Sequence, residues 1–158
     1  MELGLAFAIM GGALAVGLAG GGSAMGISYA GQMSCGILTE SPEKFGSLMI
    51  LSIMPGTQGI YGLATCFIVA MRIGLMTGTP LPLTTAQGLQ IFGACLPMAL
   101  AGFISAPYQG KVAASGAAAV ARRAEEFGHA MIMVALVEIY ALFGFIITLM
   151  FVWIFIPL

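Results

Sequence analysis

Five polar side chains lie in stretches that are otherwise apolar: Thr57, Gln58, Tyr61, Gln109 and Glu138. Glu138 is the most costly of them, because it is the single formal charge in the apolar C-terminal stretch of the chain. In hydrocarbon, a carboxylate near a helix centre costs about 3 kcal/mol on insertion scales. Buried carboxylates of this kind mark ion or proton paths, so Glu138 predicts a transport site.

The chemistry of the group favours a cation larger than a proton. Thr57 offers a hydroxyl oxygen, Gln58 and Gln109 offer amide oxygens, and Glu138 adds one negative charge. Oxygen ligands suit hard cations, and a single charge balances a monovalent ion. The set therefore predicts Na⁺ or Li⁺. A proton carried on Glu138 stays the alternative, since it would need only the carboxylate and one hydrogen-bond partner.

Two neighbouring residues support such a site. Pro55 cannot donate a backbone N–H and distorts the preceding turn, which makes nearby carbonyl oxygens available. Tyr61 follows Thr57 by four residues, so it shares the same helix face and can donate its hydroxyl to the carboxylate of Glu138.

The polar residues also share one depth along their predicted helices. Glu138 follows Glu126 by twelve residues, which is about 18 Å of helix. Gln58 follows Lys44 by fourteen residues, or about 21 Å. Gln109 precedes the paired arginines after Ala121 by a similar distance of about 20 Å. This agreement predicts that three helices meet at one level.

The elements that position these residues must lie in a membrane. The chain of 158 residues is 60% hydrophobic and 7% charged, which leaves too little polar surface for a water-soluble domain of this size. We predict an all-α membrane protein with a single domain over residues 1–158. Its four spanning helices are expected near 4–38, 44–75, 84–121 and 125–156. The N-terminus carries Glu2 and no positive residue, so its first apolar segment is expected to be retained.

The two halves of the chain are similar. The stretch EKFGSLMILSIMPGTQGIYGL, which begins at Glu43, aligns with EEFGHAMIMVALVEIYALFGF, which begins at Glu125, at a constant offset of 82 residues. This predicts a duplicated hairpin, with repeat one over 1–76 and repeat two over 84–158. The first and third helices are rich in small residues and the other two are bulky. Such a wedge suits a ring with the slim helices inside, although ordinary packing in a monomeric bundle, as in a transporter or structural protein, would also use small residues.

Other kinds of site are excluded or disfavoured. The net charge of −1 argues against a nucleic-acid partner, which would call for a basic patch. The glycine-rich stretch GGGSAMG lacks the Gly-Lys-Ser/Thr ending of a phosphate loop. We find no catalytic set and expect no cofactor. His129 is expected at the membrane boundary, and the separate cysteines, which are expected to be small buried residues, are Cys35, Cys66 and Cys95.

The charge distribution predicts the orientation. With four spans, both termini lie on one side and loops 39–43 and 122–124 on the other. The loop side carries Lys44, Arg122 and Arg123, whereas the terminal side carries Arg72. Positive residues favour the cytoplasm, so we expect cytoplasmic loops and outer termini in a multi-pass protein of the cell membrane.

The motifs PGTQGIYG, YQGKVAASG and VEIYALFGF resemble the membrane-ring proteolipid (of the K or c type) of V-type ATPases, with the greatest similarity to the sodium-pumping bacterial form. The resemblance covers nearly the whole chain. Proton-pumping vacuolar relatives keep the final glutamate but typically lack the Thr-Gln pair and the glutamine of the third helix.

The resemblance implies Na⁺ bound by the side chains of Thr57, Gln58, Gln109 and Glu138, and by the backbone carbonyl of Met54. It places Tyr61 behind the carboxylate as a hydrogen-bond donor. The family usually has leucine at the position of Met54, a difference that leaves the main-chain ligand intact. The pair Pro107-Tyr108 also departs from the pattern and puts the position of Gln109 in question.

The resemblance further implies a rotary machine. Identical subunits would form a closed ring in the lipid, and the ring would turn against a stator a/I-type subunit with an essential arginine. Central-stalk subunits would connect it to a soluble head that hydrolyses ATP, so this chain would be a non-catalytic subunit.

Overall fold

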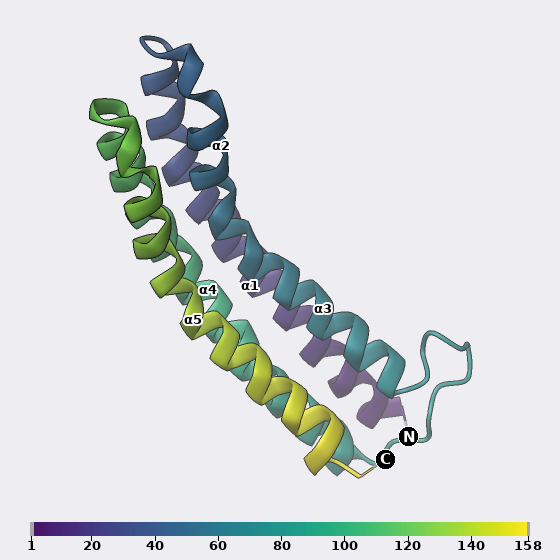
Figure 1. Ribbon diagram of the computed structural model, residues 1–158. Helices are drawn as coiled ribbons and strands as arrows, with labels where there is room; N and C mark the ends of the chain where they lie inside the picture. Colours follow the sequence, from purple (N-terminus) through teal and green to yellow (C-terminus); the bar gives the residue numbers. More distant parts are fainter. Residues whose placement is uncertain (1, 158) are drawn as a thin grey trace.

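The computed structural model describes residues 2 to 157, which form helices joined by short turns and by one longer loop over residues 73–84 (Figure 1). The α-helices are α1 (Glu2–Leu38), α2 (Phe45–Ile53), α3 (Thr57–Arg72), α4 (Thr85–Arg122) and α5 (Phe127–Met150). Three 3-10 turns, η1 (Pro42–Lys44), η2 (Met54–Gly56) and η3 (Ala124–Glu126), precede α2, α3 and α5, and the π-helical turn η4 (Phe151–Phe155) follows α5.

Four of the described segments are long and apolar enough to cross a membrane, which agrees with the predicted number of spans. They are Leu3–Leu38, Pro42–Arg72, Thr85–Arg122 and Ala124–Phe155. The second span was expected to continue to residue 75, but its helix ends at Arg72. The reason is local, because Gly74 adopts a left-handed conformation with φ of +77° that a regular helix does not allow.

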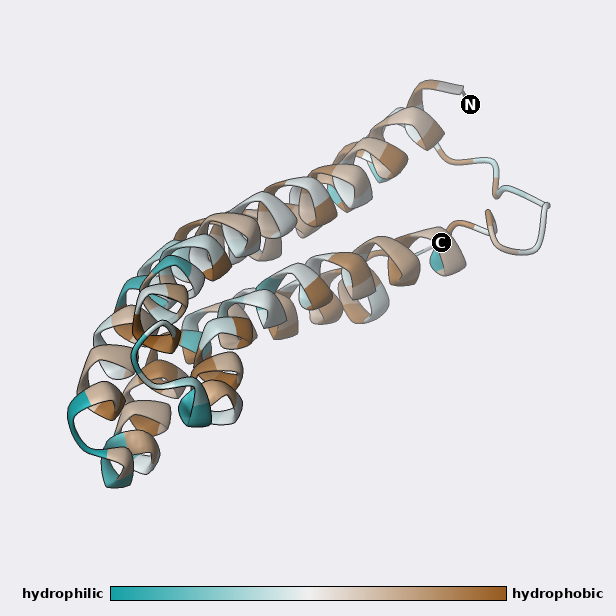
Figure 2. Ribbon diagram, turned by 90° about the horizontal axis from the view of Figure 1, so that it is seen from above, coloured by the Kyte–Doolittle hydropathy of each residue, from teal (hydrophilic) through white to brown (hydrophobic). Residues whose placement is uncertain are grey.

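The spans form two helical hairpins whose chain directions match. Both termini lie at one end of the bundle, and the two short connections between antiparallel helices lie at the other (Figure 1). Hydrophilic residues gather mainly at this second end, whereas the helix shafts are pale to brown (Figure 2). A multi-pass membrane protein follows from this arrangement.

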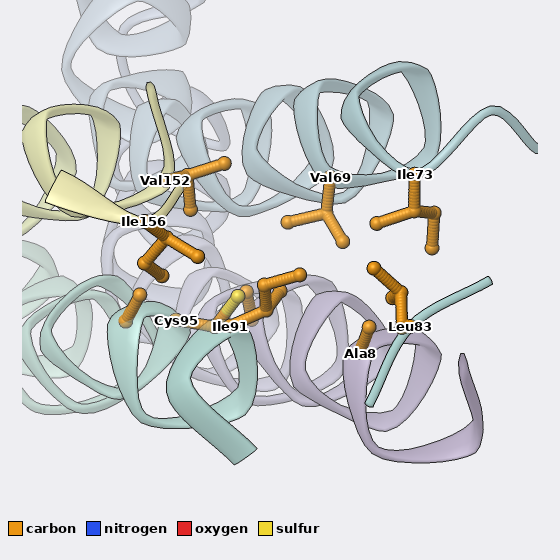
Figure 3. Packing of buried hydrophobic residues seen from close by; sticks show 10 residues of the cluster. Ala8, Val69, Ile73, Leu83, Ile91, Cys95, Val152 and Ile156 are labelled. Atoms are coloured by element: carbon orange, nitrogen blue, oxygen red, sulfur yellow. The ribbon is translucent and has the colours of Figure 1, made fainter. Parts of the chain in front are cut away.

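Two apolar clusters hold the hairpins together. The cluster near the termini includes Ala8, Val69, Ile91, Cys95 and Val152, which come from α1, α3, α4 and η4 (Figure 3). The cluster near the short connections has members that include Leu48, Leu51, Ala113, Val120 and Val134. The polar residues of interest belong to neither cluster, so they occupy a level with apolar packing on both sides.

At the end of the bundle that holds the termini, Arg72 links the two hairpins. Its guanidinium donates to the carbonyl oxygens of Val152 (3.4 Å) and Ile156 (3.2 Å) and lies 5.3 Å from the ring centre of Trp153. The last carbonyls of a helix have no partner within the helix. Arg72 therefore connects the end of α3 to the end of the other hairpin.

Helices α1 and α4 run parallel and approach closely at glycines. A Cβ added to Gly110 would lie 2.5 Å from the Cα of Gly26, which is closer than two carbon atoms can pack. Small residues permit this approach of two backbones in lipid, where packing rather than hydrophobicity holds helices together.

We expect Gly110→Val to destabilise the bundle, because the added side chain must push α1 away from α4. Overpacking of this kind costs about 1 to 3 kcal/mol, and a protein of this size loses about 2 to 4 °C of Tm per kcal/mol. Thermal unfolding in detergent measures the effect. Gly36→Val is the matched control, since a Cβ there has no neighbour within 4 Å; equal Tm values for the two variants would contradict the close contact.

Candidate ion-binding site

The break in the second span results from Pro55. The 3-10 turn Met54–Gly56 separates α2 from α3, and the hydroxyl of Thr57 donates to the carbonyl oxygen of Met54 at 3.0 Å. Two residues later, the backbone N–H of Gly59 donates to the Ser23 hydroxyl of α1 at 2.8 Å. The interrupted helix is thus held against α1 and presents two closely spaced oxygens, those of Met54 and Thr57.

Gln58 and Gln109 meet inside the bundle. Both side chains are completely buried, and Nε2 of Gln58 donates to Oε1 of Gln109 at 2.5 Å. Nε2 of Gln109 in turn donates to the carbonyl oxygen of Val134 at 3.1 Å. These two bonds fix the direction of both amides. Oε1 of Gln58 consequently faces the hydroxyl of Thr57, at 3.4 Å.

Glu138 lies on α5 and receives a hydrogen bond from the other hairpin. The Tyr61 hydroxyl donates to its Oε1 at 2.6 Å, and the Tyr61 ring stacks on Phe145 with ring centres 5.5 Å apart. Among the charged side chains that the structure describes, none lies within ion-pair distance of Glu138. A half-buried carboxylate with a hydroxyl donor and no fixed cation can hold either a proton or a mobile cation.

Hydrogen bonds join the six residues expected at the site in two groups. Met54, Thr57, Gln58 and Gln109 are linked by hydrogen bonds, and Tyr61 joins Glu138 to the same helix one turn after Gln58. Across residues 2 to 157, there is no cluster of three or more His, Cys, Asp or Glu side chains of the kind that holds a transition metal. The donor set is hydroxyl, amide, carbonyl and carboxylate oxygen, which suits a hard cation.

Pro107 does not displace Gln109. Helix α4 runs continuously from Thr85 to Arg122 through Pro97 and Pro107, and Gln109 stays buried with both amide atoms bonded. Pro107 therefore does not break α4 before Gln109.

Two contacts at this level were not predicted from the sequence. Ser23 accepts the Gly59 N–H, and the Val134 carbonyl accepts from Gln109. The sequence gives a weak indication of the role of Ser23, since it is a polar residue inside a glycine- and alanine-rich stretch. The sequence gives no indication of the role of Val134, because any residue supplies a backbone carbonyl.

His129 lies at the loop end of the bundle, as expected of a boundary residue. It is exposed, and its Nδ1 lies 3.0 Å from Oε2 of Glu126. The three cysteines are unpaired; Cys95 is buried and Cys66 partly buried, as expected, but Cys35 is exposed. The prediction of burial is wrong for Cys35, because position 35 lies on a face of α1 that no other described helix covers.

Comparison with known proteins gives matches to one family. The family model for the C subunit of ATP synthase matches residues 10–69 and again residues 92–151, an offset of 82 residues. The chain is 38% identical over 94% of its length to "V-type sodium ATPase subunit K" of Enterococcus hirae, of which it covers 92%. It is also 38% identical over 89% of its length to "A-type ATP synthase subunit K" of Methanocaldococcus jannaschii, of which it covers 59%.

Proposed function

Because this chain belongs to the family of the ATP synthase C subunit, we propose that it carries Na⁺ across the membrane on Glu138 within a rotating ring of identical copies. It is a non-catalytic rotor subunit of a V/A-type ATPase. The observation that supports Na⁺ is the network that joins the Thr57, Gln58 and Gln109 oxygens, together with the hydrogen bond from Tyr61 of the same helix to the single carboxylate of Glu138. The relative named as a sodium ATPase subunit supports the same ion.

The described donor set fits a small cation. Thr57 Oγ1 and the Met54 carbonyl oxygen lie 3.0 Å apart, so both can face one ion. Oε1 of Gln109 accepts from Gln58 but has a second lone pair for a cation. Na⁺ would be held by Thr57, Gln58, Gln109, Glu138 and the Met54 carbonyl, with Tyr61 fixing the carboxylate from behind, and Li⁺ could take its place.

Rotation follows from the cost of burying charge. A carboxylate without a cation is expensive to expose to lipid, whereas a loaded and neutral site is not. In our proposal, the loaded copy moves through lipid, and an essential arginine of a stator a/I-type subunit offsets the charge of the empty copy. ATP hydrolysis in the soluble head drives the ring through central-stalk subunits, and loops 39–43 and 122–124 face the cytoplasm. With one site per four helices, few ions move per turn, which favours pumping against steep gradients over ATP synthesis.

The alternative ion is a proton on Glu138, for which the Tyr61–Glu138 pair alone would suffice. A carbodiimide that attacks only protonated carboxyl groups separates the two. We expect Na⁺ at constant pH to slow labelling of Glu138 strongly, because a bound cation displaces the proton. K⁺ at the same ionic strength is the control. Labelling that is unaffected by Na⁺ would rule out a sodium site and favour the proton.

A further inference from the structure

The start of α3 carries two of the proposed ion ligands and lies directly after the break made by Pro55. Helix α3 begins at Thr57, so Thr57 and Gln58 belong to its first turn. The first backbone N–H groups of a helix have no partner within that helix. Gly56, at the N-cap of α3, has no side chain that could accept from them. This segment therefore supplies no side-chain cap of its own.

Ser23 of α1 takes the place of that cap. Its hydroxyl oxygen accepts the backbone N–H of Gly59, the third residue of α3, at 2.8 Å. Serine is a preferred N-cap residue, because its oxygen accepts the N–H of the second or third helical residue. Here the serine comes from another helix. Ser23 is only 5% exposed, and a Cβ added to Gly59 would lie 3.2 Å from its Oγ, so the two helices are in close contact at this point.

The same stretch of α1 also contacts the proline turn. A Cβ added to Gly26, three residues after Ser23, would lie 2.6 Å from the Cβ of Pro55. Pro55 precedes the ligand pair Thr57–Gln58 in the chain, and Gly59 follows it. Because α1 contacts the backbone on both sides of the pair, it fixes the position from which the two ligand side chains project.

The second repeat contains the same serine without the helix break. Ser105 lies 82 positions after Ser23 and is 6% exposed, but its Oγ has no hydrogen-bond partner among the described residues. Val137 stands there in place of Pro55, and α5 runs through this position without interruption. The buried serine is thus bonded to a backbone N–H in the repeat that carries the proline and the ligand pair, and not in the repeat that lacks them.

The capped N–H matters for a cation because of its charge. Free N–H groups at the start of a helix carry a positive partial charge, which disfavours a cation beside them. The Thr57 hydroxyl and the Met54 carbonyl oxygen, 3.0 Å apart, lie at this helix start. The oxygen of Ser23 places a negative partial charge against the N–H of Gly59, so it reduces the repulsion that a cation would meet there.

We propose that Ser23 is a positioning residue of the Na⁺ site, which holds the first turn of α3 in the geometry that binds the ion. The proposal rests on the proposed function and adds a residue that acts without touching the ion. Gln58 precedes Gly59 directly, and its Nε2 lies 2.5 Å from Oε1 of Gln109 with both side chains completely buried. Such a close contact leaves little room for movement, so a displaced first turn would misplace the ligand oxygens.

Ser23→Ala in the assembled ring tests this role. The substitution should raise about fivefold the Na⁺ concentration that half-protects Glu138 from carbodiimide, which is the size of effect expected for loss of a serine cap. Ser23→Gly removes the same hydroxyl without adding any atom and replaces the alanine variant if that variant does not assemble. Thermal unfolding and native mass are measured on the same samples.

Thr148→Val is the matched control for a general loss of stability. The hydroxyl of the buried Thr148 accepts the backbone N–H of Met98 at 3.2 Å, so this variant loses the same kind of contact between helices. Thr148 follows Glu138 by ten residues, or about 15 Å of helix. We expect a lower Tm for both variants but unchanged Na⁺ protection for Thr148→Val. Ser105→Ala, which removes the equivalent hydroxyl of the second repeat, should also leave Na⁺ protection unchanged.

The outcomes separate this role from the proposed function. Na⁺ protection that is unchanged in Ser23→Ala, or weakened equally in Thr148→Val, would overturn the role of Ser23 and leave the Na⁺ site intact. If Na⁺ fails to protect Glu138 even in the unmodified chain, the proposed function fails, and the role of Ser23 fails with it.

Discussion

Glu138→Gln is expected to abolish Na⁺ transport while the ring still assembles. The amide keeps the shape of the side chain but removes the negative charge of the site, and Tyr61 retains an acceptor there. Loss of one partner of a buried ionic interaction costs about 3 to 5 kcal/mol. At 1.4 kcal/mol per tenfold change, Na⁺ affinity should fall at least about 100-fold.

Radiolabelled Na⁺ binding to the purified ring and ATP-driven Na⁺ uptake into vesicles measure this effect, and native mass checks assembly. Glu40→Gln is the matched control, because Glu40 is an exposed carboxylate in the loop and should leave binding unchanged. Retained uptake by Glu138→Gln would refute the role of this residue. If the Glu138→Gln variant fails to form the ring, Glu138 has a structural role instead.

Gln109→Ala is expected to lower Na⁺ affinity about 10- to 100-fold. The substitution removes a ligand oxygen and leaves Nε2 of Gln58, a buried donor, without its acceptor. An unsatisfied buried group of this kind costs about 1 to 3 kcal/mol. The Na⁺ concentration that half-protects Glu138 from carbodiimide measures the shift.

The control for this variant is Gln90→Ala, an exposed glutamine of the same helix. A proton carrier would show no protection by Na⁺ in either protein, because the carboxylate of Glu138 would then bind a proton and no Na⁺. If Gln109→Ala leaves Na⁺ protection unchanged, Gln109 is a packing residue and does not bind the ion.

The fold could be predicted because the lipid environment restricts the choices. Long uncharged stretches specify helices, and the offset of 82 residues specifies the duplication. The end of the second span was placed three residues too far, since Gly74 and the residues after it remain apolar. Hydrophobicity alone does not distinguish a helix from an apolar turn, and the left-handed φ of Gly74 depends on the local backbone.

The level of the site could be predicted from helix rise, but its hydrogen bonds could not. Spacing places Gln58 and Gln109 at one depth, yet their direct bond depends on the rotation of each helix about its axis. That rotation is set by glycine contacts such as Gly26–Gly110, which involve residues distant in sequence. The contacts made by Ser23 and the Val134 carbonyl follow from the same packing, so they became visible only in three dimensions.

The hydrogen bond between Tyr61 and Glu138 joins the two halves of the chain, and this has a consequence for biogenesis. The half that emerges first from the ribosome carries Tyr61, Gln58 and Thr57 but no buried charge, so it can enter the bilayer at little cost. The half that follows contains Glu138. Insertion of its carboxylate is expensive unless a hydrogen-bond donor is already present in the membrane. The order of the repeats along the gene thus places the hydrogen-bond partner of the costly group in the membrane before that group is synthesised.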